Sequence, residues 1–312
     1  MEPMLATPAP APAALPHGPD WVFEVKWDGV RALADVHDGR LRITSRNGRD
    51  VTPGYPELAA LAGLGDVLLD GEVVLLDRGR PSFAALAERM HVRDPRRAGV
   101  LAASRPVTYL VFDVLRRDGQ DLTPRPLTER RAVLDGLTSL PAHVEVSPWY
   151  DDGDDLWSVT RAHGLEGVVA KRRGSPYRPG RRSSDWVKAA HRRTRTAVVG
   201  GWRPESTGTG RLGALLLGAP DAAGGLRYLG RAGSGLGGTA ARTLRDVLAP
   251  HARARSPFVD DVPAVDARGT VWVEPTVLVD TEYLVRTPTG RLRQPVVRGV
   301  RTDTVADPWE QP

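Results

Sequence analysis

The sequence predicts an α+β protein of two domains: a mixed domain of antiparallel sheets and helices over residues 1–194, and a small β-barrel such as an OB-fold over residues 195–312. Three observations predict this. A length of 312 residues favours about two domains. Strand and helix patterns are interspersed before residue 194, whereas short strands and glycine turns surround a single helix candidate after it. A content of 41% hydrophobic and 26% charged residues is typical of a globular chain.

Apolar and alternating runs place the elements of the first domain. The expected strands are 21–25, 31–36, 41–45, 107–115, 167–170 and 186–189, and the expected helices are 55–64, 82–90, 127–137 and 156–163. Thr128 is the expected N-cap of the third helix, and Gly164 ends the fourth. Residues 6–19, rich in alanine and proline, predict an extended leader. Asp70-Gly71-Glu72 taken alone predicts a hairpin turn within the apolar run 67–76.

The second domain is predicted from short strands separated by glycine turns. The expected strands are 197–202, 212–217, 226–230 and 270–279, and the helix is 239–248. Several short strands with one helix favour a small barrel.

Composition excludes several classes of protein. The chain has no cysteine, which excludes disulfides, cysteine zinc sites, iron–sulfur clusters and a cysteine nucleophile. No apolar run reaches the roughly 20 residues that span a bilayer. The first residues lack a basic segment followed by an apolar one, so they do not predict a signal peptide. We therefore expect a cytoplasmic protein with no membrane partner.

The basic residues are strongly skewed toward arginine. Of 43 basic residues only Lys26, Lys171 and Lys188 are lysines. Arginine stays protonated, whereas lysine can act as a neutral amine nucleophile once its surroundings lower its pKa. The three lysines are therefore candidates for a catalytic role. The alternative is that they are surface residues without a function.

Basic charge is also clustered. Residues 171–182 hold six cations and no acid, residues 286–301 hold five arginines and no acid, and Arg192, Arg193 and Arg195 lie between them. Such runs are typical of proteins that follow a phosphate backbone, although a single run is more often a solvated face. Three runs in one chain favour a nucleic acid as partner.

Six short motifs contain all three lysines. In order they are Glu24-Val25-Lys26-Trp27-Asp28-Gly29-Val30-Arg31, Thr44-Ser45-Arg46-Asn47-Gly48, Asp70-Gly71-Glu72, Tyr109-Leu110-Val111-Phe112-Asp113, Glu166-Gly167-Val168-Val169-Ala170-Lys171 and Asp185-Trp186-Val187-Lys188. Each alone has a plain explanation: Asp28-Gly29 predicts a tight turn, and Phe112 suits a core. As an ordered set they resemble the motifs of the covalent nucleotidyltransferase superfamily of ATP-dependent DNA ligases, RNA ligases and mRNA capping enzymes. The resemblance runs from about residue 3 to the C-terminus.

The resemblance is strongest to the ligase domain of bacterial end-joining ligases and to related small stand-alone bacterial ligases. It is carried there by Pro3-Met4-Leu5-Ala6-Thr7, residues 21–33, Gly290-Arg291-Leu292-Arg293-Gln294-Pro295 and Val297-Arg298-Gly299-Val300-Arg301-Thr302-Asp303. It implies a nucleotidyltransferase domain followed by an OB-fold domain that grips duplex DNA.

The resemblance implies a lysyl-AMP intermediate on Lys26, whose AMP then passes to a 5′-phosphate at a nick before the 3′-hydroxyl seals the strand. The implied ATP or AMP ligands are Glu24, Arg31, Arg46, Glu72, Phe112, Lys171, Arg182, Lys188 and Arg301. Within this set Glu24 would contact adenine, Phe112 would stack on it, and Lys171 and Lys188 would hold the α-phosphate. Glu72 and Glu166 would bind Mg²⁺ or Mn²⁺, which takes oxygen ligands.

The implied partner is nicked or broken duplex DNA, contacted by Arg46, Arg192, Arg193 and Arg203. We expect a monomer associated with the bacterial nucleoid in DNA repair. Any polymerase or nuclease activity would come from other repair proteins.

Two departures from the family pattern leave alternatives open. Ala190 stands where a second lysine is usual, and Thr304 follows Asp303 where a lysine is usual. They motivate a paralogue that binds nicked or broken DNA without efficient sealing. An RNA ligase is the other alternative, against which the C-terminal motifs speak. An NAD-dependent ligase would carry cysteine zinc ligands that this chain lacks.

Overall fold

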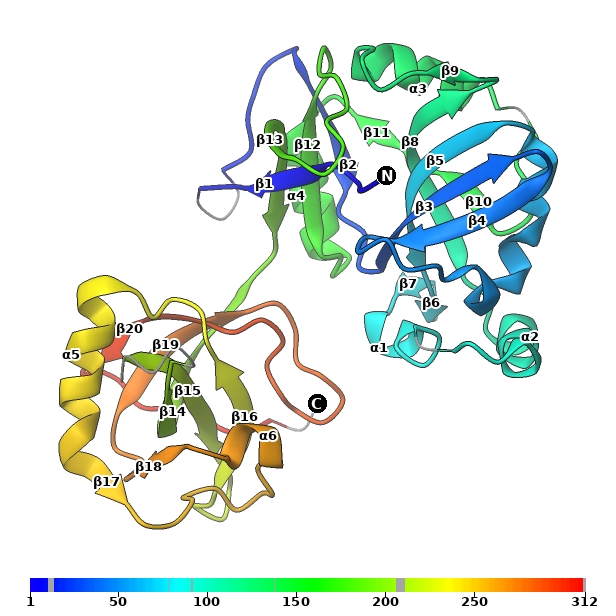
Figure 1. Ribbon diagram of the computed structural model, residues 1–312. Coiled ribbons are helices and arrows are strands. Elements are labelled where there is room, and N and C mark those ends of the chain that lie inside the picture. Colours follow the sequence, from blue (N-terminus) through cyan, green and yellow to red (C-terminus); the bar gives the residue numbers. More distant parts are fainter. Residues whose placement is uncertain (11–13, 78, 91, 138, 206–210, 311–312) are drawn as a thin grey trace. The chain divides into compact units, whose positions relative to one another are not determined.

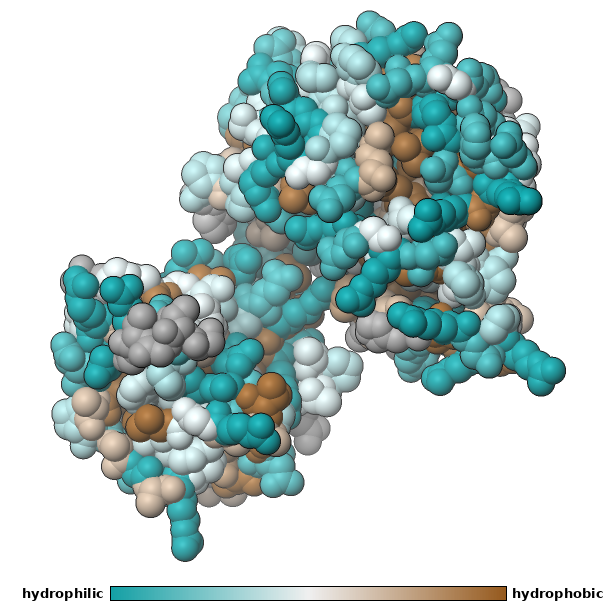
Figure 2. Space-filling model, in the orientation of Figure 1, coloured by the Kyte–Doolittle hydropathy of each residue, from teal (hydrophilic) through white to brown (hydrophobic). Residues whose placement is uncertain are grey.

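A computed structural model describes residues 1–312 apart from 11–13, 78, 91, 138, 206–210 and 311–312. The chain divides into two compact units, Met1–His191 and Arg192–Pro312 (Figure 1). Hydrophilic side chains cover most of the visible face of each unit (Figure 2). No helix in the described part of the chain is long and apolar enough to cross a membrane.

The first unit contains a five-stranded sheet that includes the N-terminal segment. Its strands, in spatial order, are β1 (Leu5–Pro8), β13 (Arg182–Ala190), β12 (Gly167–Arg172), β2 (Trp21–Val25) and β11 (Trp149–Tyr150). Only β1 and β13 pair in parallel. Helix α4 (Gly153–Ala162) packs on this sheet, with Leu156 in a cluster that includes Phe23 and Val168.

A second sheet of the same unit is mostly antiparallel. Its strands, in spatial order, are β10 (Val144–Val146), β8 (Thr108–Arg117), β5 (Val67–Val74), β3 (Val30–His37) and β4 (Arg40–Ser45), with β9 (Gln120–Asp121) beside β8. The elements around it are α1 (Phe83–Leu86), α2 (Pro95–Ser104), α3 (Leu127–Asp135), the 3-10 segments Thr52–Gly54 and Pro56–Leu64, and the small hairpin β6 (Leu76–Asp77) with β7 (Arg80–Pro81). Its core includes Ala34, Leu69 and Val111, all fully buried.

The second unit is built on one sheet around the long strand β14 (Arg193–Pro204). The other strands are β15 (Leu212–Pro220), β16 (Leu226–Ala232), β17 (Ala252–Arg253), β18 (Val271–Val273), β19 (Leu278–Tyr283) and β20 (Val296–Arg301). The helical elements are α5 (Gly238–Leu248), α6 (Ala264–Ala267) and the 3-10 turn Ala249–His251. Among the described residues the sheet does not close into a full barrel, and a single bridge joins Ser234 to Val296 beyond β16.

The hairpin turn predicted at Asp70-Gly71-Glu72 is wrong, because these residues lie in the middle of β5. Gly71 is there for a different reason. A Cβ atom at Gly71 would lie 2.6 Å from the ring of Tyr109. The Tyr109 ring lies across the strand, and its hydroxyl donates hydrogen bonds to the carbonyls of Ala32 and Leu69. The string therefore marks a crowded strand rather than a reversal of the chain.

Other differences concern where elements begin and end. The helix expected over 82–90 is only Phe83–Leu86, and the N-cap of α3 is Pro126 instead of Thr128. The strand expected over 270–279 is divided into β18 and β19. Part of the predicted leader forms β1, because its backbone pairs with a strand far away in sequence. The predicted strand pair 31–36 and 41–45 and the helix 239–248 are confirmed within two residues.

Candidate active site

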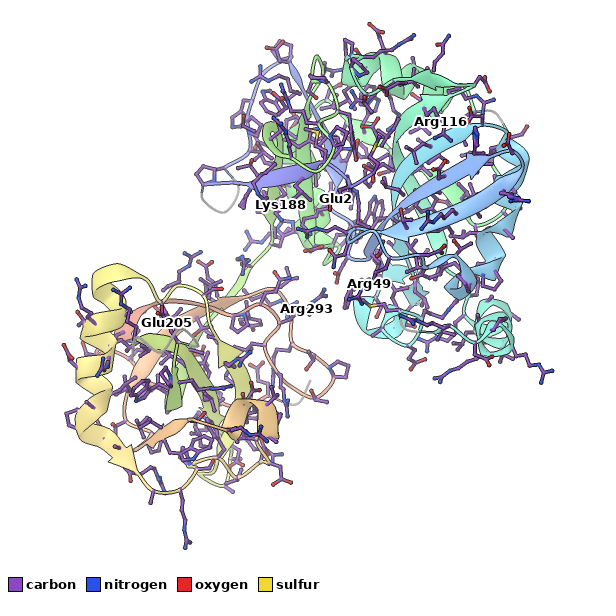
Figure 3. The ribbon with its side chains drawn as sticks, in the orientation of Figure 1. Glu2, Arg49, Arg116, Lys188, Glu205 and Arg293 are labelled. Carbon is purple, nitrogen blue, oxygen red and sulfur yellow. The ribbon has the colours of Figure 1, made fainter. Side chains whose placement is uncertain are left out.

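One face of the first sheet carries three of the predicted residues. The register sets Glu24 opposite Val169 and Val169 opposite Lys188 across β2, β12 and β13. Lys171 lies two residues beyond Val169 and opposite Trp186. Because directly opposed residues and residues two apart share a face, Glu24, Lys171, Trp186 and Lys188 all project to the same side. Lys188 is labelled on β13 in Figure 3.

The second sheet supplies Arg31, Glu72 and Phe112. Arg31 on β3 lies opposite Glu72 on β5. In β8, Asp113 pairs with Asp70 and Val111 with Gly71, so that Phe112 is the extra residue of a β-bulge. A bulge shifts the alternation of side chains and is common beside functional sites. Here it accompanies an aromatic ring that lines the same pocket as Arg31 and Glu72.

These two faces line one pocket within the first unit. It is lined by Leu5, Ala6, Glu24, Val25, Lys26, Trp27, Arg31, Arg46, Glu72, Phe112, Val169, Lys171, Arg182, Trp186 and Lys188. All predicted nucleotide ligands except Arg301 are in this set, together with the predicted nucleophile. Residues as far apart in the sequence as Leu5 and Lys188 are thus brought to one cavity.

Lys26 is held at the end of β2 and forms an ion pair with Glu166. The backbone N–H of Lys26 donates to the carbonyl of Gly167 at 2.9 Å, so the end of β2 lies beside the start of β12. At the predicted tight turn, Gly29 lies at a bend directly before β3, and Asp28 has no regular secondary structure. Glycine is needed at position 29 because a Cβ atom would lie 2.3 Å from the carbonyl oxygen of Val73.

One end of the pocket is a buried ion pair between aromatic rings. Lys171 Nζ donates to both carboxylate oxygens of Glu24 at 2.8 Å, and the two side chains are 2% and 3% exposed. The same Nζ lies 4.3 Å from the ring centroid of Phe112 and 4.4 Å from that of Trp186. Burial raises the pKa of Glu24 and lowers the pKa of Lys171, while their mutual attraction opposes both shifts.

The other end gathers positive charge. Burial lowers the pKa of Lys188, and the positive charges of Lys26 and Arg182 lower it further. Arg46, exposed in the turn after β4, acts in the same direction. Such a group of cations is suited to bind a polyanion, because a phosphate would offset the repulsion between the positive charges.

Glu72 and Glu166 are the acidic groups near these cations. Burial raises the pKa of Glu72 to about 8, although Arg31 and Lys26 oppose the shift, and the negative charge of Glu166 adds to it. No group of three or more metal-ligating side chains occurs among the described residues. Two carboxylates suit Mg²⁺ or Mn²⁺, because Mg²⁺ is usually bound by one or two carboxylates together with substrate phosphates.

Glu166 is not itself a lining residue of this pocket, although it contacts Lys26, which is. Four other predicted residues lie outside the pocket, in the second unit. Arg301, on β20, forms ion pairs with Asp280 at 2.7 Å and Asp303 at 2.8 Å. Arg192 donates to the carbonyl of Gln294, and Arg203 donates to the carbonyl of Val265. Arg193 is exposed at the start of β14.

Sequence reasoning missed part of the pocket wall. Trp186 was noted only as a neighbour of Lys188, although its position two residues away on a strand puts both side chains on one face. Leu5 and Ala6 also line the pocket, and nothing local in the alanine- and proline-rich segment indicates that β1 pairs with β13.

Protein-family models and relatives agree with this geometry. The model of the ATP dependent DNA ligase domain matches residues 3–189, and that of the ATP dependent DNA ligase C terminal region matches residues 208–304. The chain is 42% identical over 288 residues to the multifunctional non-homologous end joining protein LigD of Mycobacterium bovis, covering 91% of this chain and 36% of that protein. It is 40% identical over 315 residues to LigD of Mycolicibacterium smegmatis, covering 99% and 39%. The chain thus spans less than two fifths of the length of these relatives.

Solved structures show the same likeness. The ligase domain from M. tuberculosis LigD is 40% identical with a TM-score of 0.54, and covers 96% of this chain and 94% of that one. A mycobacterial DNA ligase D complexed with ATP and MES is 39% identical with a TM-score of 0.55, covering 98% of each chain. A Lig E DNA ligase shares the fold at 16% identity and a TM-score of 0.65. The predicted α+β class, a nucleotidyltransferase domain followed by an OB-fold domain, is confirmed.

Proposed function

The chain belongs to the ATP-dependent DNA ligase family, and from this premise we propose that it seals nicks between a 5′-phosphate and a 3′-hydroxyl in duplex DNA. The observation that carries the proposal is the position of Lys26. Its amine lines a pocket with a buried, aromatic end and a cationic end, and it is in contact with a carboxylate. A nucleoside triphosphate presents a flat base and a polyanion, which suit those two ends.

In the proposed first step, the Lys26 amine attacks the α-phosphorus of ATP. One P–N bond forms, the bond between the α-phosphorus and its bridging oxygen breaks, and pyrophosphate leaves with that electron pair. The amine must be neutral to attack, and the Glu166 carboxylate is in contact with Nζ to receive its proton. Lys188, Arg182 and Arg46 neutralise charge on the phosphate oxygens.

In the following steps AMP passes from Lys26 to the 5′-phosphate at the nick, and the 3′-hydroxyl then displaces AMP to form the phosphodiester. Each step exchanges one bond at phosphorus for another. We propose Arg31 and Arg46 as the pocket residues that bind the DNA 5′-phosphate after the nucleotide.

We propose Glu72 and Glu166 as the protein ligands of Mg²⁺ or Mn²⁺. A bound cation would supply charge neutralisation to the phosphate oxygens. The pKa of Glu72 is raised by burial, and a bound cation would favour its charged form.

The buried end of the pocket suits the adenine base. Phe112 and Trp186 offer ring surfaces, and Glu24 offers an acceptor for the exocyclic amine of adenine. Because Lys171 is bound to Glu24 and is surrounded by these rings, we propose that it acts at the base, whereas Lys188 acts at the α-phosphate.

We propose residues 1–194 as the nucleotidyltransferase domain and residues 195–312 as a DNA-binding OB-fold domain. Arg192, Arg193 and Arg203 are proposed DNA contacts, and Arg301 a ligand of ATP. We also propose a monomeric, cytoplasmic and nucleoid-associated protein. A role in the repair of broken DNA is supported by the non-homologous end joining in the name of its LigD relatives.

The first test is the intact mass of purified protein before and after incubation with ATP and Mg²⁺ or Mn²⁺. We expect an AMP adduct in the wild type and none in Lys26→Ala. The control is Arg80→Ala, an exposed arginine of β7, which should form the adduct like the wild type. Absence of any adduct in folded wild-type protein would exclude the proposed chemistry and favour a protein that binds nicks without sealing them.

The second test addresses the nucleic acid. We expect sealing of a 5′-phosphorylated nick in duplex DNA and much slower sealing of the same nick in RNA. Preferential sealing of RNA would replace the DNA substrate with an RNA substrate and leave the chemistry at Lys26 unchanged.

A further inference from the structure

Arg31 is fixed at the pocket by a fully buried carboxylate. Asp70, at the centre of β5, is 0% exposed, and it accepts hydrogen bonds of 2.6 Å from Arg31 Nε and from Arg31 Nη2. Nη2 also donates to the carbonyl of Met4 at 3.2 Å. Three of the five N–H bonds of the guanidinium are therefore used. Within the described part of the chain no protein group accepts from Nη1, which leaves that nitrogen for a ligand.

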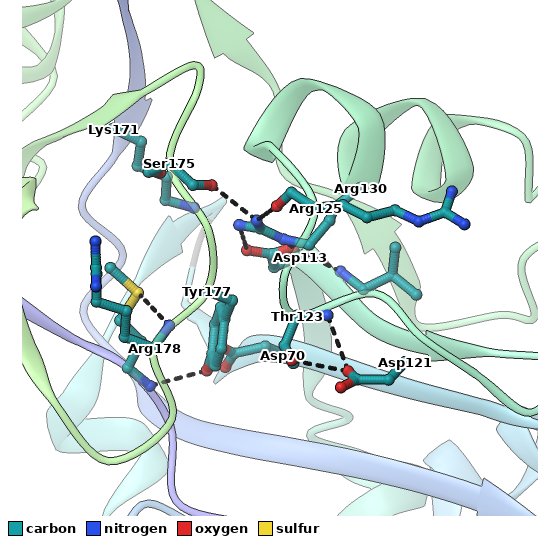
Figure 4. A network of polar contacts seen from close by, with 12 residues as sticks. Asp70, Asp113, Asp121, Thr123, Arg125, Arg130, Lys171, Ser175, Tyr177 and Arg178 are labelled. Atoms are coloured by element: carbon teal, nitrogen blue, oxygen red, sulfur yellow. Dashed lines mark hydrogen bonds and ion pairs between the residues drawn. The ribbon is translucent and has the colours of Figure 1, made fainter.

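Tyr177 completes this arrangement from a distant part of the sequence. It lies between β12 and β13 and is 3% exposed. Its hydroxyl donates to Asp70 Oδ2 at 2.6 Å and accepts from the backbone N–H of Met4 at 2.9 Å. The roles of the hydroxyl are unambiguous, because it has one proton and Met4 offers only a donor. Tyr177 and Asp70 lie side by side in Figure 4.

Tyr177 also supports the aromatic wall. Its ring meets Trp186 edge-on, with centroids 5.7 Å apart. The guanidinium of Arg31 lies 4.6 Å from the centroid of Phe112 and 5.6 Å from that of Trp186. One tyrosine thus contacts the carboxylate that orients Arg31, the ring that flanks it, and Met4, the residue before β1.

We propose that Tyr177 is a positioning residue for nucleotide binding, which acts through Asp70 to hold Arg31 with Nη1 directed to a phosphate or ribose oxygen of ATP. This inference rests on the proposed function, because it assumes that Arg31 binds the nucleotide. An arginine that is already oriented loses little rotational freedom when the ligand arrives. Tyr177 itself does not line the pocket.

A purely structural role is the competing explanation, since Tyr177 also anchors Met4. The two roles differ in one measurable respect. If Tyr177 acts through Arg31, removal of its hydroxyl has no further effect on the affinity for ATP when the guanidinium has been replaced. If it only anchors the N-terminal segment, its removal weakens ATP binding equally with or without Arg31.

The test is a double-mutant cycle in the full chain. All proteins carry Lys26→Ala, so that ATP is not consumed, and their affinity for ATP is measured by calorimetry. The cycle compares this background with the same protein carrying Tyr177→Phe, Arg31→Gln, or both changes. We expect Tyr177→Phe to weaken ATP binding by about three- to tenfold, as for loss of a hydrogen bond to a charged group. In the Arg31→Gln background we expect almost no further loss. Equal losses in both backgrounds, or no loss in either, would overturn the proposal.

The matched control is Tyr228→Phe. Tyr228 is also buried and donates to a carboxylate, that of Asp266, at 3.1 Å, but it lies in the second unit. It should leave ATP affinity unchanged. Should Tyr177→Phe fail to fold, Asp70→Asn goes through the same cycle with the same expectation.

The proposed function is tested separately by the AMP adduct of the wild type. ATP binding without an adduct, but with coupling between positions 177 and 31, would retain the positioning role and reject the chemistry. An adduct without that coupling would retain the chemistry and reject the positioning role.

Discussion

Removal of one partner of the buried Arg130–Asp113 pair is expected to destabilise the first unit strongly. Both side chains are 0% exposed. Arg130 donates from Nε and Nη2 to the two oxygens of Asp113 at 2.8 Å each, and from Nη1 to the carbonyls of Arg125 and Ser175 (Figure 4). The pair joins α3 to β8 and to the chain after β12. Replacing Arg130 by methionine would leave the Asp113 carboxylate buried without its cation.

The expected cost follows from that isolation. Removing one partner of a buried ion pair costs about 3–5 kcal/mol, because the remaining charge keeps its desolvation penalty. For a unit of this size 1 kcal/mol corresponds to about 2–4 °C, so the melting temperature should fall by roughly 6–20 °C. Adding Asp113→Leu to Arg130→Met should recover more than half of the loss, because the uncompensated charge is then removed.

The assay is denaturant unfolding of the full chain, fitted for the transition of the first unit. Arg116→Met is the matched control. Arg116 also contacts two carboxylates, those of Asp35 and Asp66, but it is 25% exposed and they are 42% and 24% exposed. A partly exposed pair of this kind should contribute no more than about 1 kcal/mol. If Arg130→Met costs no more than Arg116→Met, or the double variant is less stable than the single one, the reasoning from burial is refuted.

Three further predictions concern the pocket and Arg301. Lys171→Met should raise the KM for ATP and reduce the preference for ATP over GTP in adduct formation, because Glu24 would lose its buried partner; an unchanged preference would separate Lys171 from the base. Burial raises the pKa of Glu72 to about 8, so the stability that this group contributes is fully present below about pH 4.5 and is lost as the pH rises through 8. In EDTA, Glu72→Gln should therefore flatten the pH dependence of the unfolding free energy between pH 5 and 8. An unaltered slope would contradict this. Arg301→Ala should slow adduct formation at least about tenfold and leave sealing of a pre-adenylylated nick intact; equal slowing of both steps would remove its assignment to ATP.

The order of short motifs indicated the family and most of the pocket. Each motif lies at the end of a strand or inside one, where a fixed spacing puts the side chain on a fixed face. The roles of Glu24, Lys26 and Glu72 came from the resemblance of the ordered motifs to the family and not from predicted faces, since the string around Glu72 alone predicts a turn and in fact lies inside β5. Composition contributed as well, because a chain with three lysines among 43 basic residues has few candidates for an amine nucleophile.

Tertiary structure decided the features that depend on distant backbone. The sequence could not show that the leader forms β1 beside β13, that a bulge in β8 accompanies the placement of Phe112 in the pocket, or that Tyr177 reaches Asp70 across 107 positions. It also did not separate the two lysines expected at one phosphate. Their surroundings differ because Lys171 is buried against Glu24 while Lys188 lies among cations. Local patterns determine which residues face together on one element, whereas packing between sheets determines which of those faces meet.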